Sequence, residues 1–141
     1  MYGALDISVS GMIAQRTRMD VIAANIANAD ATRDAKGNLS PYKRRTVHFA
    51  PGDPAARNEQ GRSLGVHVAE IGQAASYRKR WDPSSPDAQT QGPDTGFVLF
   101  PDIDSTTEQV NSLIAQRAYE ANIAAAEATK SMMAQALRLI A

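Results

Sequence analysis

The side chains that could carry acid–base or metal chemistry are few in this 141-residue chain. It contains no cysteine and only two histidines, His48 and His67. Cysteine nucleophiles, thiolate metal ligands and disulfide bonds are therefore excluded. Neither histidine lies in a metal-ligand spacing, and the chain has no nucleophile-elbow motif or phosphate-binding glycine loop. We expect a protein that is not an enzyme, with no catalytic residue, no cofactor and no metal site.

Two basic clusters, at residues 43–45 and 78–80, raise the question of nucleic-acid binding. Lysine plus arginine and aspartate plus glutamate both number 15, so the formal net charge is zero. A neutral chain has no overall field that would attract nucleic acid or anionic lipid. Strand-like alternation also divides each cluster between two faces. We therefore predict no nucleic-acid partner, and interpret the clusters as solvated faces or as a docking surface for a neighbouring protein.

The N-terminal residues do not resemble a secretory signal. Residues 1–10 lack a basic region and a continuous apolar stretch. No run approaches the roughly 18 apolar residues of a membrane-spanning helix, so we expect no membrane insertion. The chain either stays in the cytoplasm or leaves it by a route without a cleaved signal.

A long helix is predicted from about residue 4 to residue 28. Its stripe has a spacing of three and four residues, which places its members on one face: Leu5, Ser8, Met12, Gln15, Met19, Ile22 and Ile26. Asn28, Asp30 and Thr32 favour termination, so the helix should end near Ala29.

A second long helix is predicted from Ser105 to the last residue. Glu108 follows Ser105 at the spacing of a capping box, in which the two side chains bond each other's backbone N–H groups. A heptad seam then runs through Ile114, Ala118, Ala121, Ala125, Ala128, Met132, Gln135 and Leu139. The helix would be about 55 Å long, which is more than one small core can cover.

Four short stretches between the helices alternate like strands, at residues 42–49, 64–71, 77–81 and 97–100. The segments at residues 51–63 and 82–95 are rich in proline, glycine and polar residues, which predicts turns or loops. We expect a small β-rich insertion that depends on the helices for its stability. Within it, Trp81 is expected to be buried because it offers a large apolar area.

The predicted fold class is mainly α with a small β insertion. The boundaries are residues 1–29 for the N-terminal helix, 30–104 for the insertion and 105–141 for the C-terminal helix. The simplest way to cover both seams is for the two helices to pair as a coiled coil and then to pack against neighbouring copies. The sequence therefore predicts an assembly protein.

Polar residues beside the seams admit two interpretations. Asn25 and Asn28 could register a neighbouring subunit, or Asn28 alone could end the helix. Arg117, Tyr119 and Asn122 could specify which helices pack together. Alternatively, they belong to a solvated face with an ordinary ion pair between Arg117 and Glu120.

Three segments resemble characteristic blocks of the flagellar axial family, which comprises rod, hook and hook–filament junction proteins. They are "ALDISVSGMIAQRTRMDVIAANIANADAT", "WDPSSPDA" and "QRAYEANIAAAEATKSMMAQAL". The short insertion and the "DPSSPDA" block are most similar to a small member of the proximal rod. The resemblance implies a structural subunit of the bacterial flagellum basal body that polymerises into the drive shaft, transmits torque and supports motility.

The resemblance also implies a periplasmic location and export by the flagellar type III apparatus without a cleaved signal peptide. Implied partners are further copies of the chain, the rod proteins FlgB, FlgF and FlgG, the adaptor FliE and the rod cap. The expected subunit-interface residues are Leu5, Met12, Met19, Ile22, Asn25, Ile26, Asn28, Ile114, Arg117, Ala118, Tyr119, Ala121, Asn122, Ala125, Ala128, Met132 and Leu139. The alternatives are another small rod protein such as FlgB, or a cytoplasmic helical adaptor that binds a partner helix.

Overall fold

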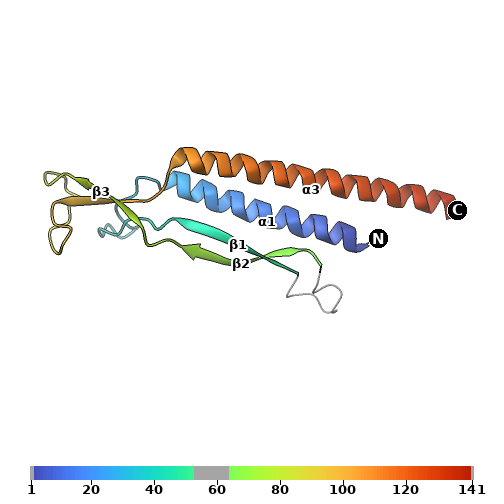
Figure 1. Cartoon of the computed structure of the whole chain (residues 1–141), viewed down its shortest axis with the longest axis horizontal. Coiled ribbons are helices and arrows are strands. Elements are labelled where there is room, and N and C mark those ends of the chain that lie inside the picture. Colours follow the sequence, from blue (N-terminus) through green and yellow to red (C-terminus); the bar gives the residue numbers. More distant parts are fainter. Residues whose placement is uncertain (1, 53–63, 141) are drawn as a thin grey trace.

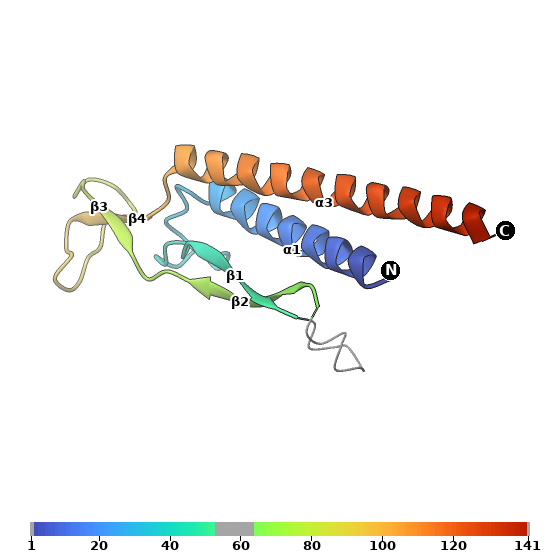
Figure 2. The ribbon, with the colours of Figure 1, turned by 45° about the vertical axis from the view of Figure 1, so that its right-hand side comes forward.

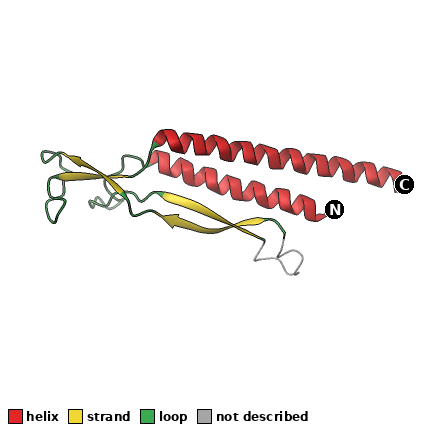
Figure 3. Ribbon diagram, in the orientation of Figure 1, coloured by secondary structure: helices red, strands yellow, loops and turns green. Residues whose placement is uncertain are grey.

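Two long helices lie at the two ends of the chain, and two small antiparallel sheets are formed by the residues between them in the sequence (Figures 1 and 3). The computed structural model describes residues 2–52 and 64–140. Its elements are α1 (Tyr2–Ala27), β1 (Arg45–Pro51), β2 (Val66–Gln73), β3 (Tyr77–Trp81), β4 (Phe97–Pro101) and α3 (Ser105–Ile140). This mixed fold confirms the predicted terminal helices and β-containing insertion. Most of the loop predicted at residues 51–63 lies outside the described residues.

The two helices lie side by side and run antiparallel, so that both chain ends are at the same end of the molecule (Figures 1 and 2). Gly11 faces Asn122, and Asn25 bonds to Glu108. These two contacts are separated by the same number of residues on each helix, so one register holds along the pair. Because α3 has 36 residues and α1 has 26, the end of α3 extends past the start of α1.

Small residues line the contact between the helices. Ala14 and Ala115 are fully buried there. A Cβ atom added to Gly11 would lie 2.8 Å from Nδ2 of Asn122, which is too close for an ordinary contact. Gly11 therefore allows the Asn122 amide to lie directly against the α1 backbone.

The β1–β2 hairpin lies along α1 on the side away from α3 (Figures 1 and 2). The backbone N–H of Val66 donates to Oγ of Ser10 over 3.1 Å. Gly65 has a φ of 85°, and a Cβ there would lie 2.6 Å from the same hydroxyl oxygen. α1 is thus covered on two sides, by α3 and by the β1–β2 hairpin, and α1 is the main neighbour of α3 among the described elements.

The β3–β4 hairpin lies beyond the end of the helix pair where α3 begins (Figure 1). Trp81 pairs with Phe97 across the hairpin, with ring centroids 4.9 Å apart, and its ring covers Gly96. The Trp81 side chain is nevertheless 63% exposed, so its predicted burial is wrong. The reason is that Trp81 belongs to a sheet of only two strands, which lies beyond the end of the helix pair.

Local hydrogen bonds explain where α3 begins and where α1 ends. The carboxylate of Asp104 accepts from the N–H groups of Thr106 and Thr107, at 3.2 and 3.3 Å. Asp104 is therefore the N-cap, and the predicted capping box of Ser105 and Glu108 is wrong although the predicted start at Ser105 is confirmed. At the end of α1, Nδ2 of Asn28 donates to the Ala24 carbonyl over 2.8 Å.

Replacing Gly11 with alanine tests whether the close approach outweighs helix propensity. Alanine favours a helix interior by about 0.5–1 kcal/mol over glycine. Overpacking against Asn122 typically costs 1–3 kcal/mol, so we expect Gly11→Ala to lower the free energy of unfolding by about 1 kcal/mol. Urea denaturation followed by helical circular dichroism measures this change.

The matched controls are Asn122→Ala alone and the double variant Gly11→Ala/Asn122→Ala. Removing the Asn122 amide removes the overlap, so Gly11→Ala should stabilise the chain in the Asn122→Ala background. A Gly11→Ala variant more stable than the unsubstituted chain would show that the contact at Gly11 has room for a methyl group.

Candidate subunit interface

Large apolar side chains lie exposed on the outer faces of both helices. On α1 these are Ile7, Val9 and Ile13. On α3 they are Val110, Leu113, Ile114, Met132, Leu137 and Leu139, of which Leu139 is 88% exposed. On α3 they form two groups, at residues 110–114 and 132–139. Exposed apolar side chains that lie close together are typical of a surface that contacts another protein.

The seam predicted on α3 is not the face that α3 presents to α1. Ile114 is 52% exposed, whereas its neighbour Ala115 is fully buried against α1. The same offset of one residue recurs at Ala121 and Asn122, because successive residues on a helix differ by about 100° in direction. The expectation that this stripe pairs with α1 of the same chain is therefore corrected. We call the exposed positions Ile114, Ala121, Ala125, Ala128, Met132 and Leu139 the outer stripe.

The predicted interface residues of α1 are mostly covered by the rest of the chain. Ile22 and Asn25 are buried, and the partly buried members are Leu5, Met12, Met19, Ile26 and Asn28. Covering by α3 and by the β1–β2 hairpin accounts for this burial. A role of these α1 residues between subunits stays a prediction.

The polar residues of α3 divide between the two faces. Tyr119 and Asn122 are partly buried beside α1, and Arg117 is exposed. The apolar Ala118, a member of the predicted seam, is also partly buried. Glu120 accepts a hydrogen bond from Nε2 of Gln116 over 3.1 Å, in place of the ordinary pair with Arg117 considered from the sequence. The exposed Arg117 remains available to a neighbouring chain.

Asn25 joins α1 to the start of β1 through its side-chain amide. Its Nδ2 donates to the Arg45 carbonyl over 2.8 Å, and its Oδ1 accepts from the Arg45 N–H over 2.9 Å. The Asn25 amide thus satisfies both backbone groups of Arg45, as the backbone of a neighbouring β-strand would. Nδ2 also donates to Oε2 of Glu108, and Oδ1 accepts from the Tyr42 hydroxyl. With 1% of its surface exposed, Asn25 acts here inside the subunit.

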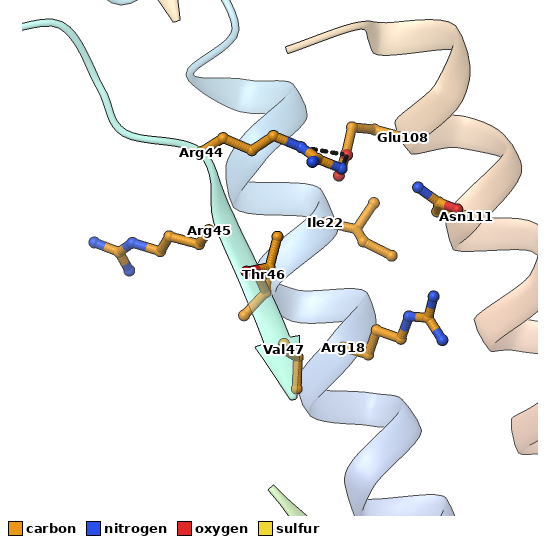
Figure 4. A pocket seen from close by; sticks show the side chains of 9 residues that line it. Arg18, Ile22, Arg44, Arg45, Thr46, Val47, Glu108 and Asn111 are labelled. Carbon is orange, nitrogen blue, oxygen red and sulfur yellow. Dashed lines mark hydrogen bonds and ion pairs between the residues drawn. The ribbon is translucent and has the colours of Figure 1, made fainter. Parts of the chain in front are cut away.

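Glu108 and Arg44 complete a polar cluster where three elements meet (Figure 4). The Glu108 carboxylate is 2% exposed, and its Oε1 accepts from both Nε and Nη2 of Arg44, at 3.0 and 2.5 Å. Arg44 immediately precedes β1, Asn25 is on α1 and Glu108 is in the first turn of α3. We call these three residues the junction cluster.

A groove of about 180 Å³ opens beside the junction cluster. α1 contributes Arg18 and Ile22, β1 contributes Thr46, and α3 contributes Asn111 (Figure 4). The Arg45 side chain points out of the groove, with its guanidinium 5.6 Å from the centre of the Tyr42 ring. The groove brings together hydrogen-bonding and charged groups but no pair of groups arranged as nucleophile and base.

A second polar contact fastens the segment after α1 to the "DPSSPDA" segment. The Asp87 carboxylate accepts from the Thr32 hydroxyl over 2.7 Å and from Nε of Arg33 over 2.6 Å. The hydrogen bond from Thr32, followed by that from Arg33, lowers the pKa of Asp87 below its ordinary value of 3.8. Two of the sequence blocks singled out above therefore contact each other through one carboxylate.

Within residues 2–52 and 64–140, no group of three or more acidic or histidine side chains could hold a metal ion. His67 places Nδ1 2.7 Å from the Gly52 carbonyl, and His48 is exposed on β1. No helix in the same part of the chain has the length and apolarity needed to cross a membrane.

Comparison with protein families assigns both helices to one class of protein. The model of the family described as "Flagella basal body rod protein" matches residues 5–36. The model described as "Flagellar basal body rod FlgEFG protein C-terminal" matches residues 94–139. Sequence similarity to basal-body rod proteins therefore covers most of α1 and most of α3.

Similarity to individual proteins extends over almost the whole chain. The flagellar basal-body rod protein FlgC of Borreliella burgdorferi is 34% identical, and the match covers 99% of this chain and 97% of that protein. FlgC of Bacillus subtilis is 35% identical, and the match covers 98% of this chain and 97% of that protein. FlgC of Yersinia enterocolitica is 37% identical, and the match covers 99% of this chain and 97% of that protein. The chain therefore belongs to the FlgC family of flagellar basal-body rod proteins, which are structural proteins and not enzymes.

Replacing Asn25 with aspartate tests the junction cluster with almost no change in volume. Aspartate cannot donate to the Arg45 carbonyl, and it places a second carboxylate beside Glu108. Breaking a buried charged network in this way typically costs 3–5 kcal/mol, so we expect a loss of about 3 kcal/mol in the free energy of unfolding. Urea denaturation measures the loss.

Asn28→Asp is the matched control, because Asn28 is partly buried and its amide makes one hydrogen bond to the preceding turn. It should lose about 1 kcal/mol, the net value of one ordinary hydrogen bond. Equal losses in the two variants would contradict a special role for Asn25.

The contact of Asp87 with Thr32 and Arg33 predicts how stability depends on pH. The pKa of Asp87 is lower in the folded chain than in the unfolded chain, so the unfolded chain binds more protons on acidification. Its stabilising contribution is complete above the ordinary value of 3.8 and is lost as the pH falls through the folded value. Hydrogen bonds from Thr107 and Thr106 lower the pKa of Asp104 in the same direction.

Urea midpoints measured between about pH 5 and pH 2 follow this loss. Thr32→Val removes the largest cause of the Asp87 shift and should lower the midpoint at pH 5 while making its decline on acidification shallower. Thr90 is an exposed threonine in the loop that carries Asp87. Thr90→Val should change neither the midpoint at pH 5 nor the slope of its decline on acidification. A decline as steep in Thr32→Val as in the unsubstituted chain would sink this account.

Proposed function

We propose that the chain polymerises through its terminal helices into the proximal part of the flagellar rod, the axial drive shaft that transmits torque. The observation that carries the proposal is the outer stripe of α3, whose six positions are all exposed in the described part of the chain. Copies arranged head to tail without closing form a helical filament, so each stripe can be covered by the next subunit. Alanines within the stripe permit close approach of another backbone.

The helix pair is proposed to form a coiled coil that continues between subunits. The constant register between α1 and α3, with small residues at their contact, supports this arrangement. The part of α3 that extends past the start of α1 adds a segment that α1 does not cover and that a neighbouring chain can pack against. Residues 1–29 and 105–141 form the axial part in this proposal, and residues 30–104 form the insertion.

The FlgC family membership supports a place in the flagellum basal body. We assign the chain to the periplasmic part of the rod, reached by type III export without a cleaved signal peptide. Partners are further copies of the chain, the rod proteins FlgB, FlgF and FlgG, the adaptor FliE and the rod cap. The exposed Arg117 and the basic strand β3 offer charged groups that would select among these neighbours.

Ala121→Phe tests the outer stripe in the living cell. The exposed position tolerates phenylalanine in the monomer, but overpacking at a close helix contact typically costs 1–3 kcal/mol per subunit. Since each 1.4 kcal/mol is about tenfold in affinity, rod assembly should fail. The variant is expressed in a strain whose own gene is deleted, and swimming and basal bodies are scored by electron cryotomography.

Ala134→Phe is the matched control. Ala134 is also exposed on α3 but points away from the outer stripe, about 140° around the helix from the direction of Ala121. It should restore swimming and complete rods. A strain carrying Ala121→Phe that swims normally with intact rods would remove the outer stripe from the interface.

A further inference from the structure

The carboxylate of Glu108 depends on groups from two other parts of the chain. Although Glu108 belongs to α3, its side chain is 2% exposed and its oxygens accept hydrogen bonds from Asn25 of α1 and from Arg44 of the insertion. Asn25 supplies a neutral amide and Arg44 supplies the positive charge. An ionised carboxylate in so buried a place is stable only when its charge is compensated.

Arg44 has a different position from its partner. It immediately precedes β1, and its side chain is 32% exposed, so it can return to water if Glu108 is removed. Glu108 has no such freedom while α1 and α3 are paired, because α1, β1 and α3 together line the groove that encloses it. The dependence therefore runs in one direction. The paired helices need the charge of Arg44 to compensate Glu108, whereas the Arg44 guanidinium can be solvated by water without the paired helices.

From this geometry we infer that Arg44 makes closure of the α1–α3 pair conditional on docking of the β1–β2 hairpin. When the hairpin is in place, the guanidinium compensates Glu108 and the helices close. When it is absent, closure buries an uncompensated carboxylate and is opposed. Arg44 is thus a positioning residue that acts on the helices through Glu108. The inference rests on contacts within one subunit and is independent of how subunits polymerise.

Spin labels across the helix pair test the inference in the full-length chain. The sequence contains no cysteine, so two introduced cysteines are labelled without background. Asp20 of α1 and Leu113 of α3 are both exposed and lie at the same level of the helix register, a few residues from the junction cluster. Double electron–electron resonance on Asp20→Cys/Leu113→Cys then reports the distance between the helices.

Three backgrounds are compared with the labelled chain. We expect one narrow distance in the starting chain, a second and longer population in Arg44→Met, and a return to one narrow distance in Arg44→Met/Glu108→Met. Recovery in the double variant is the decisive readout, because removing Glu108 cannot restore any packing that Arg44 itself provides. Arg45→Met is the matched control, since that guanidinium points away from Glu108 and should leave the narrow distance unchanged.

Each remaining outcome decides the question. A narrow distance in Arg44→Met would show that the helices close without the guanidinium, and the inference would fail. An equally broad distribution in the double variant would assign Arg44 a local role unrelated to Glu108, which also overturns it. If Arg44→Met does not fold, circular dichroism replaces the distance measurement: a folded double variant supports the inference, and an unfolded one refutes it.

Discussion

The burial of one carboxylate, that of Glu108, is the constraint on which the arrangement of the chain depends. The carboxylate is compensated where α1, the segment before β1 and α3 meet, so three segments distant in sequence must arrive at one point. Asn25 adds a second condition, because its amide is used in full by the backbone of Arg45, by Tyr42 and by Glu108 itself. The helix contact beyond this point includes the small residues Gly11 and Ala115. Such a contact allows close approach but discriminates poorly between alternative registers, which leaves the polar groups to define the geometry.

Local signals in the sequence predicted the elements well. The start of α3 at Ser105 and the strand at residues 77–81 agree with the structure, because periodicity, turn residues and caps act over a few positions. The FlgC family was likewise identifiable from blocks that lie on the helices and in one loop. Predictions that depended on residues far away in the sequence were less accurate. Trp81 was expected to be buried, but the face of the β3–β4 hairpin that carries it is uncovered.

The role of Glu108 shows why the junction cluster escaped notice. Its spacing from Ser105 fits a capping box, and nothing within a few residues indicates a partner 64 positions away in Arg44 or 83 positions away in Asn25. A cue was present in the basic cluster at residues 43–45, which was interpreted as a surface feature although the structure places Arg44 partly inside. The seam of α3 was misassigned by a single residue for a related reason. Two apolar stripes run next to each other on this helix, and only the position of α1 determines which one faces inward.

The unequal lengths of the two helices divide α3 into parts under different evolutionary constraints. Along most of α3, a substitution on the inner face must remain compatible with α1, a segment of the same gene, and the two can change together by compensating mutations. Past the start of α1, α3 has no helical partner within residues 2–52 and 64–140, and Leu139 is 88% exposed there. If neighbouring subunits cover that terminal segment, as proposed, they constrain its sequence more than the fold of its own chain does. Covariation within this protein should fade along α3 at that point, and covariation with the genes of neighbouring components should begin there.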